Sequence, residues 1–224
     1  GRGFTELLDY VAGILPEAAP AEESQEIRVA IIGRPNAGKS TLLNALVEQN
    51  RAMVSPIAGT TRDAIDSVIE KDGQLFRFVD TAGIRQRSRA ADKADRLSII
   101  MARKHLELSD IAILLIDGVE SLAAIDATIG GYAHESGRSV IIAVNKWDVV
   151  EKNASITAEF ERKIREKFKF LDYAPIVFVS AKTGQRVGRF YETIAEVFEQ
   201  RRRRIPTGEL NAFLKEVKLG RGGL

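Results

Sequence analysis

Gly33-Arg34-Pro35-Asn36-Ala37-Gly38-Lys39-Ser40 matches the phosphate-binding pattern G-x-x-x-x-G-K-[ST] at every fixed position. An apolar strand, residues 27–32, runs directly into this stretch, and residues 41–47 continue it as good helix formers. A helix that begins here points its unpaired N–H groups and its positive dipole end at a phosphate. Chance alone produces the pattern in roughly one sequence in a hundred of this length. We therefore interpret residues 33–41 as a phosphate-binding loop, Thr41 included.

Within this loop, each fixed residue type has a chemical reason. Glycines at 33 and 38 let backbone N–H groups approach phosphate oxygens without a Cβ in the way. Lys39 is expected to reach the β- and γ-phosphates, and the Ser40 hydroxyl suits a magnesium ligand. The sequence thus predicts a nucleoside triphosphate with Mg²⁺.

Outward from the loop, short β-branched runs alternate with amphipathic helical stretches, the pattern of an α/β sheet covered on both faces. The predicted strands are 27–32, 65–71, 74–79, 110–116, 139–144 and 175–179, and the predicted helices are 39–48, 93–108, 121–136, 155–168 and 187–200. Asp72-Gly73 is typical of a hairpin turn. The expected fold is an α/β P-loop NTPase with a mostly parallel six-stranded sheet and helices on both faces.

The identity of the base is predicted by a second motif, Asn145-Lys146-Trp147-Asp148, at the end of strand 139–144. Guanine presents adjacent N1–H and N2–H donors that one carboxylate such as Asp148 can accept together, whereas adenine has no such pair. A solvated turn at the strand end is the alternative interpretation. A third strand end, Ser180-Ala181-Lys182, offers backbone N–H groups for the guanine O6 and a lysine stem to cover the base.

Another candidate strand end, after residues 74–79, carries Asp80-Thr81-Ala82-Gly83. The Asp80 carboxylate can meet the magnesium shell through water, and the Gly83 N–H can meet the γ-phosphate. Asp117 is a competing carboxylate at another strand end, but no Thr-Ala-Gly follows it. We therefore prefer Asp80 for the metal and interpret Asp117 as a helix or turn cap.

Residues 59–63, Gly-Thr-Thr-Arg-Asp, lie in a polar stretch without strong periodicity and are the expected first switch. A threonine hydroxyl there can add a magnesium ligand, and its N–H can bond the γ-phosphate, so loss of that phosphate would release the loop. We favour Thr61 over Thr60 as that ligand.

Composition excludes several function classes. The chain has no cysteine, so disulfide frameworks, thiolate zinc sites and thiol nucleophiles are ruled out. Its longest apolar runs are far shorter than the roughly 20 residues that cross a bilayer, and no secretory signal opens the sequence. We expect a cytoplasmic location and no membrane partner. A net charge of +2 gives no global attraction to nucleic acid, although Arg201 to Arg204 form a local basic run.

The ordered motifs resemble the translation-factor class of small GTPases across residues 27–200. Residues 33–40, 59–63 and 145–148 are most similar to the second GTPase domain of the Der (EngA) family, the tandem-GTPase ribosome assembly factors of the TrmE-Era-EngA class. The resemblance implies a small GTPase-like fold that binds GTP and GDP and acts in assembly of the large ribosomal subunit. Residues 121–129 depart mildly from it, being less polar than usual.

The resemblance also implies a domain plan. Residues 1–15, with an apolar face at helical spacing, would be the closing helix of an upstream sister GTPase domain, and 16–26 a linker. Residues 27–200 would be the GTPase domain, and 201–224 the truncated start of a KH-like RNA-binding domain. The alternatives are a generic amphipathic helix for 1–15 and a plain surface helix for the tail. Expected partners are the large-subunit precursor and rRNA, with the sister and KH-like domains in cis.

Where Ras-like enzymes carry a glutamine that orients water, this chain has Ile84. A hydrophobic side chain cannot position water, and the resemblance implies a substitute: Asn36, which in related GTPases helps to hold a potassium ion near the phosphates. A turn-forming role is the alternative for Asn36. The predicted catalytic residues are Lys39, Asn36, Thr61 and Gly83, and the predicted metal ligands are Ser40, Thr61, Asp80 and, for K⁺, Asn36. The predicted nucleotide contacts are Gly33, Arg34, Pro35, Asn36, Ala37, Gly38, Lys39, Ser40, Thr41, Asp80, Thr81, Ala82, Gly83, Ile84, Asn145, Lys146, Trp147, Asp148, Ser180, Ala181 and Lys182.

Two other function classes compete with a GTP-hydrolysing switch. A binding module that holds nucleotide without turnover is encouraged by Ile84. An ATP-using P-loop enzyme would require Asn145 and Asp148 to be unrelated to base recognition.

Overall fold

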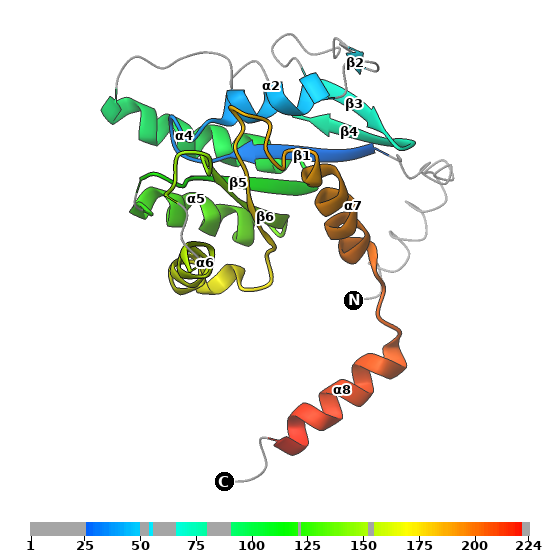
Figure 1. Cartoon of the computed structure of the whole chain (residues 1–224). Helices are drawn as coiled ribbons and strands as arrows, with labels where there is room; N and C mark the ends of the chain where they lie inside the picture. Colours follow the sequence, from blue (N-terminus) through cyan, green and yellow to red (C-terminus); the bar gives the residue numbers. More distant parts are fainter. Residues whose placement is uncertain are drawn as a thin grey trace, which may run out of the picture.

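The computed structural model describes residues 26–49, 54–55, 66–79, 91–120, 122–151 and 155–220. Its elements follow the alternating order expected of an α/β sheet (Figure 1). They are β1 (Glu26–Ile32), α2 (Lys39–Gln49), β2 (Val54–Ser55), β3 (Ser67–Lys71), β4 (Gln74–Phe78), α4 (Ala91–Glu107), β5 (Ile111–Asp117), α5 (Ala124–Glu135), β6 (Ser139–Asn145), α6 (Ile156–Lys167), the short 3₁₀ helix η2 (Lys169–Leu171), β7 (Ile176–Phe178), α7 (Arg189–Arg202) and α8 (Thr207–Gly220).

The strands form one sheet in the order β2-β3-β4-β1-β5-β6-β7. The strands from β4 through β1, β5 and β6 to β7 run parallel, while β3 is antiparallel to both β4 and β2. All six predicted strands are confirmed, and the mostly parallel topology with them. The two-residue edge strand β2 is an addition that the sequence did not predict.

Two apolar layers cover the two faces of the sheet. Alternate residues of β1 separate them, because Ile27, Val29 and Ile31 face one core while Ala30 and Ile32 face the other. The first core contains buried residues of α2 and α7, and the second contains those of α4, α5 and α6. Helices on both faces are therefore confirmed, and the central strands β1 and β5 lie between the two cores.

The predicted hairpin between β3 and β4 is confirmed. Its turn residues, Asp72 and Gly73, have φ angles of 53° and 78°. Positive φ at two central turn positions is what a tight hairpin requires, and Asp and Gly tolerate it better than most residues.

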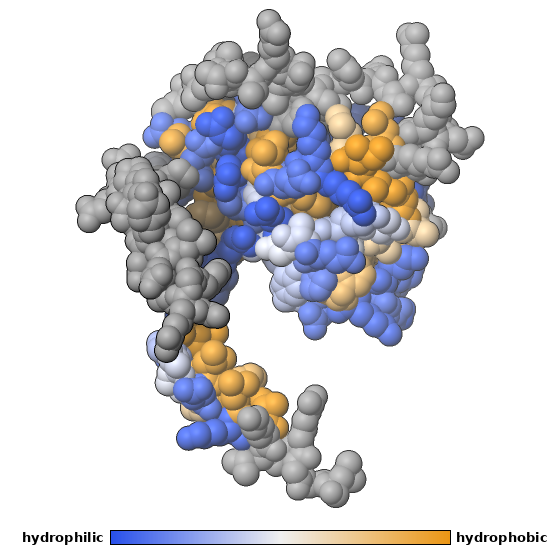
Figure 2. Space-filling model, turned by 180° about the vertical axis from the view of Figure 1, so that it is seen from behind, coloured by the Kyte–Doolittle hydropathy of each residue, from blue (hydrophilic) through white to orange (hydrophobic). Residues whose placement is uncertain are grey.

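The tail after the last core helix is a separate helix, α8, which lies apart from the sheet (Figure 1). The described side chains from Arg201 to Lys215 are all exposed. Hydrophobic side chains gather along α8 in Figure 2, and those exposed by 41–59% are Leu210, Phe213, Leu214 and Val217. Their spacing of three, one and three residues places them on one face. Among the described residues, no helix has the length and apolar character needed to cross a bilayer. Residues 1–25, with the predicted first helix and most of the linker, lie outside the described residues.

Candidate nucleotide-binding site

The phosphate loop leaves β1 at its carboxyl end, in the middle of the sheet between β4 and β5. Gly33 is buried with φ 147°, and a Cβ at this position would lie 2.4 Å from the carbonyl oxygen of Leu115 on β5. Only glycine fits against that strand without displacing backbone. The first glycine of the motif is thus required by packing as well as by any ligand.

Gly38 is required for a similar reason at the other end of the loop. Its φ is 98°, and a Cβ would lie 2.2 Å from the side-chain Nδ2 of Asn145. The structure therefore brings the phosphate motif and the base motif into direct contact, although they are more than a hundred residues apart in the sequence.

Lys39 begins α2 and directs its ammonium back onto the loop. Its Nζ donates to the carbonyl oxygens of Gly33 at 2.9 Å and Arg34 at 2.7 Å. Burial lowers the pKa of Lys39 from its ordinary value of 10.5 to about 8. Among the described residues, this ammonium donates to two neutral carbonyl oxygens, so an anion would complement its charge.

The start of α2 supplies further donors for such an anion. The first turn closes with Leu42 N–H donating to Gly38 O at 2.8 Å, and the backbone N–H groups of a first helical turn point towards the space in front of the helix. Ser40 lies in this first turn and is half-buried, while Thr41 and Asn36 are exposed and Pro35 is half-buried. Asn36 has φ 63°, a left-handed conformation that asparagine adopts readily. The residues present fit a polyphosphate.

Asn145 joins three loops of the site from a buried position, 2% exposed. Its Nδ2 donates to Ala37 O at 2.8 Å, and its Oδ1 accepts from Ala181 N at 2.9 Å. The structure thus brings residues 33–41, 145–148 and 180–182 close together. The Ala181 N–H donates to Asn145, and the neighbouring Lys182 is exposed, while the contact of these residues with a guanine O6 stays a prediction.

Lys146 has φ 61°, and its Nζ donates to Asp117 Oδ2 at 2.5 Å. The other oxygen of Asp117, Oδ1, accepts from Val119 N at 2.9 Å and Glu120 N at 3.4 Å, which confirms Asp117 as a turn cap. Burial opposes ionisation of Asp117, but the hydrogen bonds from Lys146 and Val119 outweigh it and lower the pKa of this carboxyl. Asp117 is therefore a charged partner that fixes the Lys146 stem.

The other two residues of the base motif behave differently. Trp147 is 3% exposed, and its ring packs on Phe178 at 4.5 Å and edge-on to Phe160 at 5.3 Å between centroids. Its side chain anchors the motif in the core and does not face the nucleotide side. Asp148 is half-buried. Ser180 is fully buried, and its Oγ accepts from Thr183 N at 3.1 Å, so its hydroxyl shapes the turn.

Five predicted contacts from the strand-end motif, Asp80, Thr81, Ala82, Gly83 and Ile84, lie outside the described residues, as do Thr60 and Thr61 of the first switch. Their roles stay predictions.

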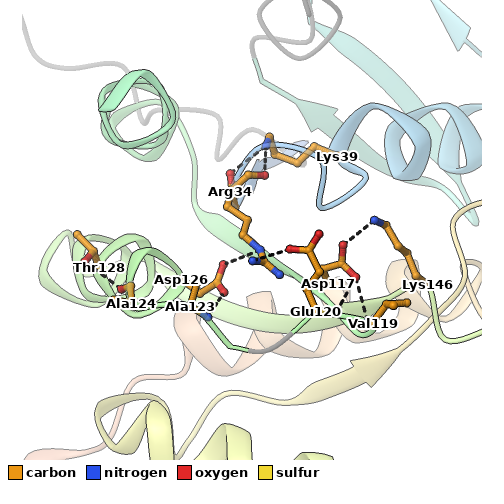
Figure 3. A network of polar contacts seen from close by, with 11 residues as sticks. Arg34, Lys39, Asp117, Val119, Glu120, Ala123, Ala124, Asp126, Thr128 and Lys146 are labelled. Carbon is orange, nitrogen blue, oxygen red and sulfur yellow. Dashed lines mark hydrogen bonds and ion pairs between the residues drawn. The ribbon is translucent and has the colours of Figure 1, made fainter. Parts of the chain in front are cut away.

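Two acidic residues that the sequence did not predict contact the phosphate loop through Arg34 (Figure 3). Arg34 Nη1 lies 2.9 Å from Glu120 Oε2, and Arg34 Nε lies 3.7 Å from Asp126 Oδ1. Asp126 is fully buried. Its sequence signal is a single carboxylate in the mainly apolar stretch of residues 121–129, because a buried carboxylate requires a compensating partner.

Comparison with protein families shows that residues 28–146 match a family model described as 50S ribosome-binding GTPase. GTPase Der of Caldanaerobacter subterraneus subsp. tengcongensis is 47% identical over 219 residues, which is 98% of this chain and 50% of that protein. GTPase Der of Lachnospira eligens is 49% identical over 216 residues, 96% of this chain and 49% of that protein. The chain thus spans about half the length of the curated relatives it matches.

Among solved structures, Era in complex with MgGDPNP and nucleotides 1506–1542 of 16S ribosomal RNA is similar, with a TM-score of 0.59 and 30% identity. The match covers 77% of this chain and 56% of that one. Translation elongation factor SelB from Methanococcus maripaludis, with a GTP analogue, has a TM-score of 0.58 at 18% identity over 80% of this chain and 35% of that one, which bears on the fold alone.

Proposed function

The chain belongs to the family of 50S ribosome-binding GTPases, and from this premise we propose that it binds GTP with Mg²⁺, hydrolyses it to GDP and acts as a switch. The observation that carries the proposal is the link through Asn145, which joins the phosphate loop at Ala37 to the guanine motif and to Ala181. A triphosphate held at Lys39 and a base held at Asp148 then belong to one site. An ATP-using enzyme has no need for this link to the Asn-Lys-x-Asp motif.

Each of the proposed site residues would have its own role in binding and hydrolysis. The Lys39 ammonium, already desolvated, would neutralise charge that develops between the β- and γ-phosphates. Ser40, Thr61 and Asp80 would hold the magnesium ion, which supplies charge neutralisation when bound. The Gly83 N–H would meet the γ-phosphate, and Thr61 would lose its contact when that phosphate leaves.

We further propose that hydrolysis is stimulated by potassium bound with the help of Asn36. Asn36 is exposed, and its left-handed backbone keeps it at the outer edge of the loop. Because Ile84 has no hydrogen-bonding side chain, a fixed monovalent cation would replace the missing stabilisation of the transition state.

Phosphate release measured in potassium and in sodium buffer tests this directly. We expect faster turnover in potassium, and we expect Asn36→Ala to remove that difference. Asn44→Ala is the matched control, since Asn44 is an exposed asparagine on the outside of α2. Turnover that is equal in both salts would leave GTP hydrolysis standing but reject the potassium site. Intact nucleotide binding with no turnover in either salt would favour the binding-module alternative.

Base recognition has its own experiment. Asp148→Asn exchanges an acceptor pair for an amide, so we expect the preference to move from guanosine towards xanthosine nucleotides. Competition of GTP, XTP and ATP against a fluorescent GDP measures it, with the exposed Asp172→Asn as control. An unchanged preference, or equal competition by ATP, would reject Asp148 as the reader of the base.

For partners, we propose that residues 201–224 begin a KH-like domain and that the whole protein, with a sister GTPase domain, acts on large-subunit precursors and rRNA. The exposed apolar stripe of α8 supports this, because an unpartnered face on a regular helix needs a covering surface. The adjoining Arg201 to Arg204 are exposed and suit phosphate groups.

Co-sedimentation with isolated large ribosomal subunits, in GTP analogue and in GDP, tests the RNA side of this proposal. Glutamine at all four positions 201–204 should weaken sedimentation. Glutamine at Arg162, Lys163 and Lys167, which are exposed on α6, is the control for loss of positive charge. Equal loss in both variants would show that only the overall charge matters.

A further inference from the structure

The side chain of Arg34 points away from the phosphate side of its loop and towards the connection between β5 and α5 (Figure 3). Only 12% of it is exposed. Its two acidic neighbours are Glu120 on that connection, whose side chain is 60% exposed, and the fully buried Asp126 in the first turn of α5. A single guanidinium thus ties the phosphate loop to two carboxylates on another segment.

Asp126 is held rigidly where it meets Arg34. It is the third residue of α5, and its Oδ2 accepts from Ala123 N at 2.9 Å, which fixes the start of the helix. Burial raises the pKa of Asp126, while the Ala123 N–H and the Arg34 charge act in the opposite direction. Within the described part of the chain, the buried Oδ1 has no hydrogen bond. The Arg34 charge is therefore the main compensation for this oxygen, and its loss would leave a buried carboxylate uncompensated.

The connection that carries Glu120 and leads into α5 with Asp126 is itself bound to residues of the base motif. Asp117 caps the turn at Val119 and Glu120 and binds the Lys146 ammonium. Gly118 N donates to Asn145 O at 2.9 Å. The two carboxylates consequently sit on a segment that the guanine motif keeps in place, so they can act as a fixed point for Arg34.

The main chain of Arg34 belongs to the phosphate site. Its carbonyl oxygen accepts from Lys39 Nζ at 2.7 Å. Any shift of residue 34 therefore moves an acceptor of the lysine that is expected to hold the phosphates.

We propose that Glu120 and Asp126 are positioning residues for nucleotide binding: through Arg34 they hold the phosphate loop, and the carbonyl that receives Lys39, against the β5–α5 connection. The inference rests on the proposed nucleotide site. It assigns these carboxylates no contact with the nucleotide.

A double-mutant cycle on the release of fluorescent GDP tests the proposal. Asp126→Asn keeps the volume and an oxygen for the Ala123 N–H but removes the charge, and Arg34→Met keeps an unbranched stem without the charge. We expect each variant to release GDP about tenfold faster, and the double variant to be no faster than either single one, because contacting residues are non-additive. Arg34→Lys should recover part of the loss. Glu120→Gln, at an exposed position that folding tolerates, should give a smaller increase of about threefold.

Asp110→Asn is the matched control. Asp110 pairs with Arg28 at 3.0 Å, its side chain is 15% exposed, and the pair lies at the amino end of β1 and β5, away from the phosphate loop. Its GDP release should equal that of the wild type. Additive effects of Asp126→Asn and Arg34→Met would indicate general loosening and overturn the proposal, as would GDP release unchanged by Glu120→Gln and Arg34→Met. A wild-type chain that binds no GDP would instead reject the proposed function.

Discussion

The side-chain amide of Asn145 donates to the carbonyl oxygen of Ala37 at 2.8 Å, and this one bond joins the guanine motif to the phosphate loop. Both groups are buried, and the other end of the same amide accepts from Ala181 N at 2.9 Å. The orientation of the asparagine is thereby fixed from both sides. It can serve the site without touching a nucleotide, by holding three loops at their correct separation.

Asn145→Ala should therefore weaken the fold as well as nucleotide binding. It leaves the Ala37 carbonyl and the Ala181 N–H buried without partners, which costs about 1 to 3 kcal/mol for each group. Urea unfolding of the nucleotide-free chain should show a loss of about 2 kcal/mol or more, whereas Asn44→Ala on the exposed face of α2 should change little. Equal stabilities for the two variants would show that the hydrogen bonds of Asn145 to Ala37 and Ala181 do not contribute to the stability of the fold.

Gly38→Ala should damage the site by a different route. The added Cβ would lie 2.2 Å from Asn145 Nδ2, and the φ of 98° is strained for alanine. We expect GDP affinity to fall by about tenfold or more, measured by displacement of a fluorescent nucleotide.

Gly131→Ala is the comparison for that variant. Gly131 lies inside α5 with nothing within 4 Å of an added Cβ, so alanine should leave affinity unchanged and raise stability slightly. GDP affinity equal to wild type in Gly38→Ala would contradict the crowded geometry.

Much of the fold could be predicted because local and tertiary preferences agree. The central strands β5 and β6 are continuous apolar runs that are buried along almost their whole length, so they could be recognised without tertiary information. Strand β2 was missed because two residues, Val54 and Ser55, contain no periodic signal. Helix α5 begins at Ala124 instead of 121 because Asp126 accepts from Ala123 N, an N-terminal bond that a hydrophobic pattern does not reveal.

The site also contains residues that could be predicted from the sequence and residues that could not. Gly38, Lys39 and Asn145 could be found from spacing alone, since the chemistry of phosphates and guanine constrains their types. The pairing of Arg34 with Glu120 and Asp126 could not, because it depends on how β1 and β5 lie side by side in the sheet. Trp147 was predicted to contact the nucleotide because of its place in the motif, but its ring is buried in the core.

Truncation of a side chain should affect stability differently in α7, which packs on the sheet, and in α8, which is exposed. Ile194 on α7 is fully buried, whereas Phe213 on α8 is 59% exposed. Ile194→Ala should lower the free energy of unfolding by about 2 to 5 kcal/mol. Phe213→Ala should stay within about 0.5 kcal/mol of wild type in this chain. Comparable losses in the two variants, read from urea unfolding curves, would mean that α8 packs on the core.

The lowered pKa of Lys39 gives nucleotide binding a pH dependence with a definite sign. In the free chain, Lys39 loses its proton near pH 8, whereas beside phosphates the cation is favoured and the pKa rises again. Binding should therefore take up only a small fraction of a proton at pH 7 and a clearly larger fraction at pH 8.5. Affinity for GDP should accordingly decrease as pH rises above 8. Titration calorimetry in two buffers of different ionisation enthalpy measures this uptake, with the pH 7 titration as the internal control. Binding heats at pH 8.5 that do not depend on the buffer would show that Lys39 is already fully charged in the free chain.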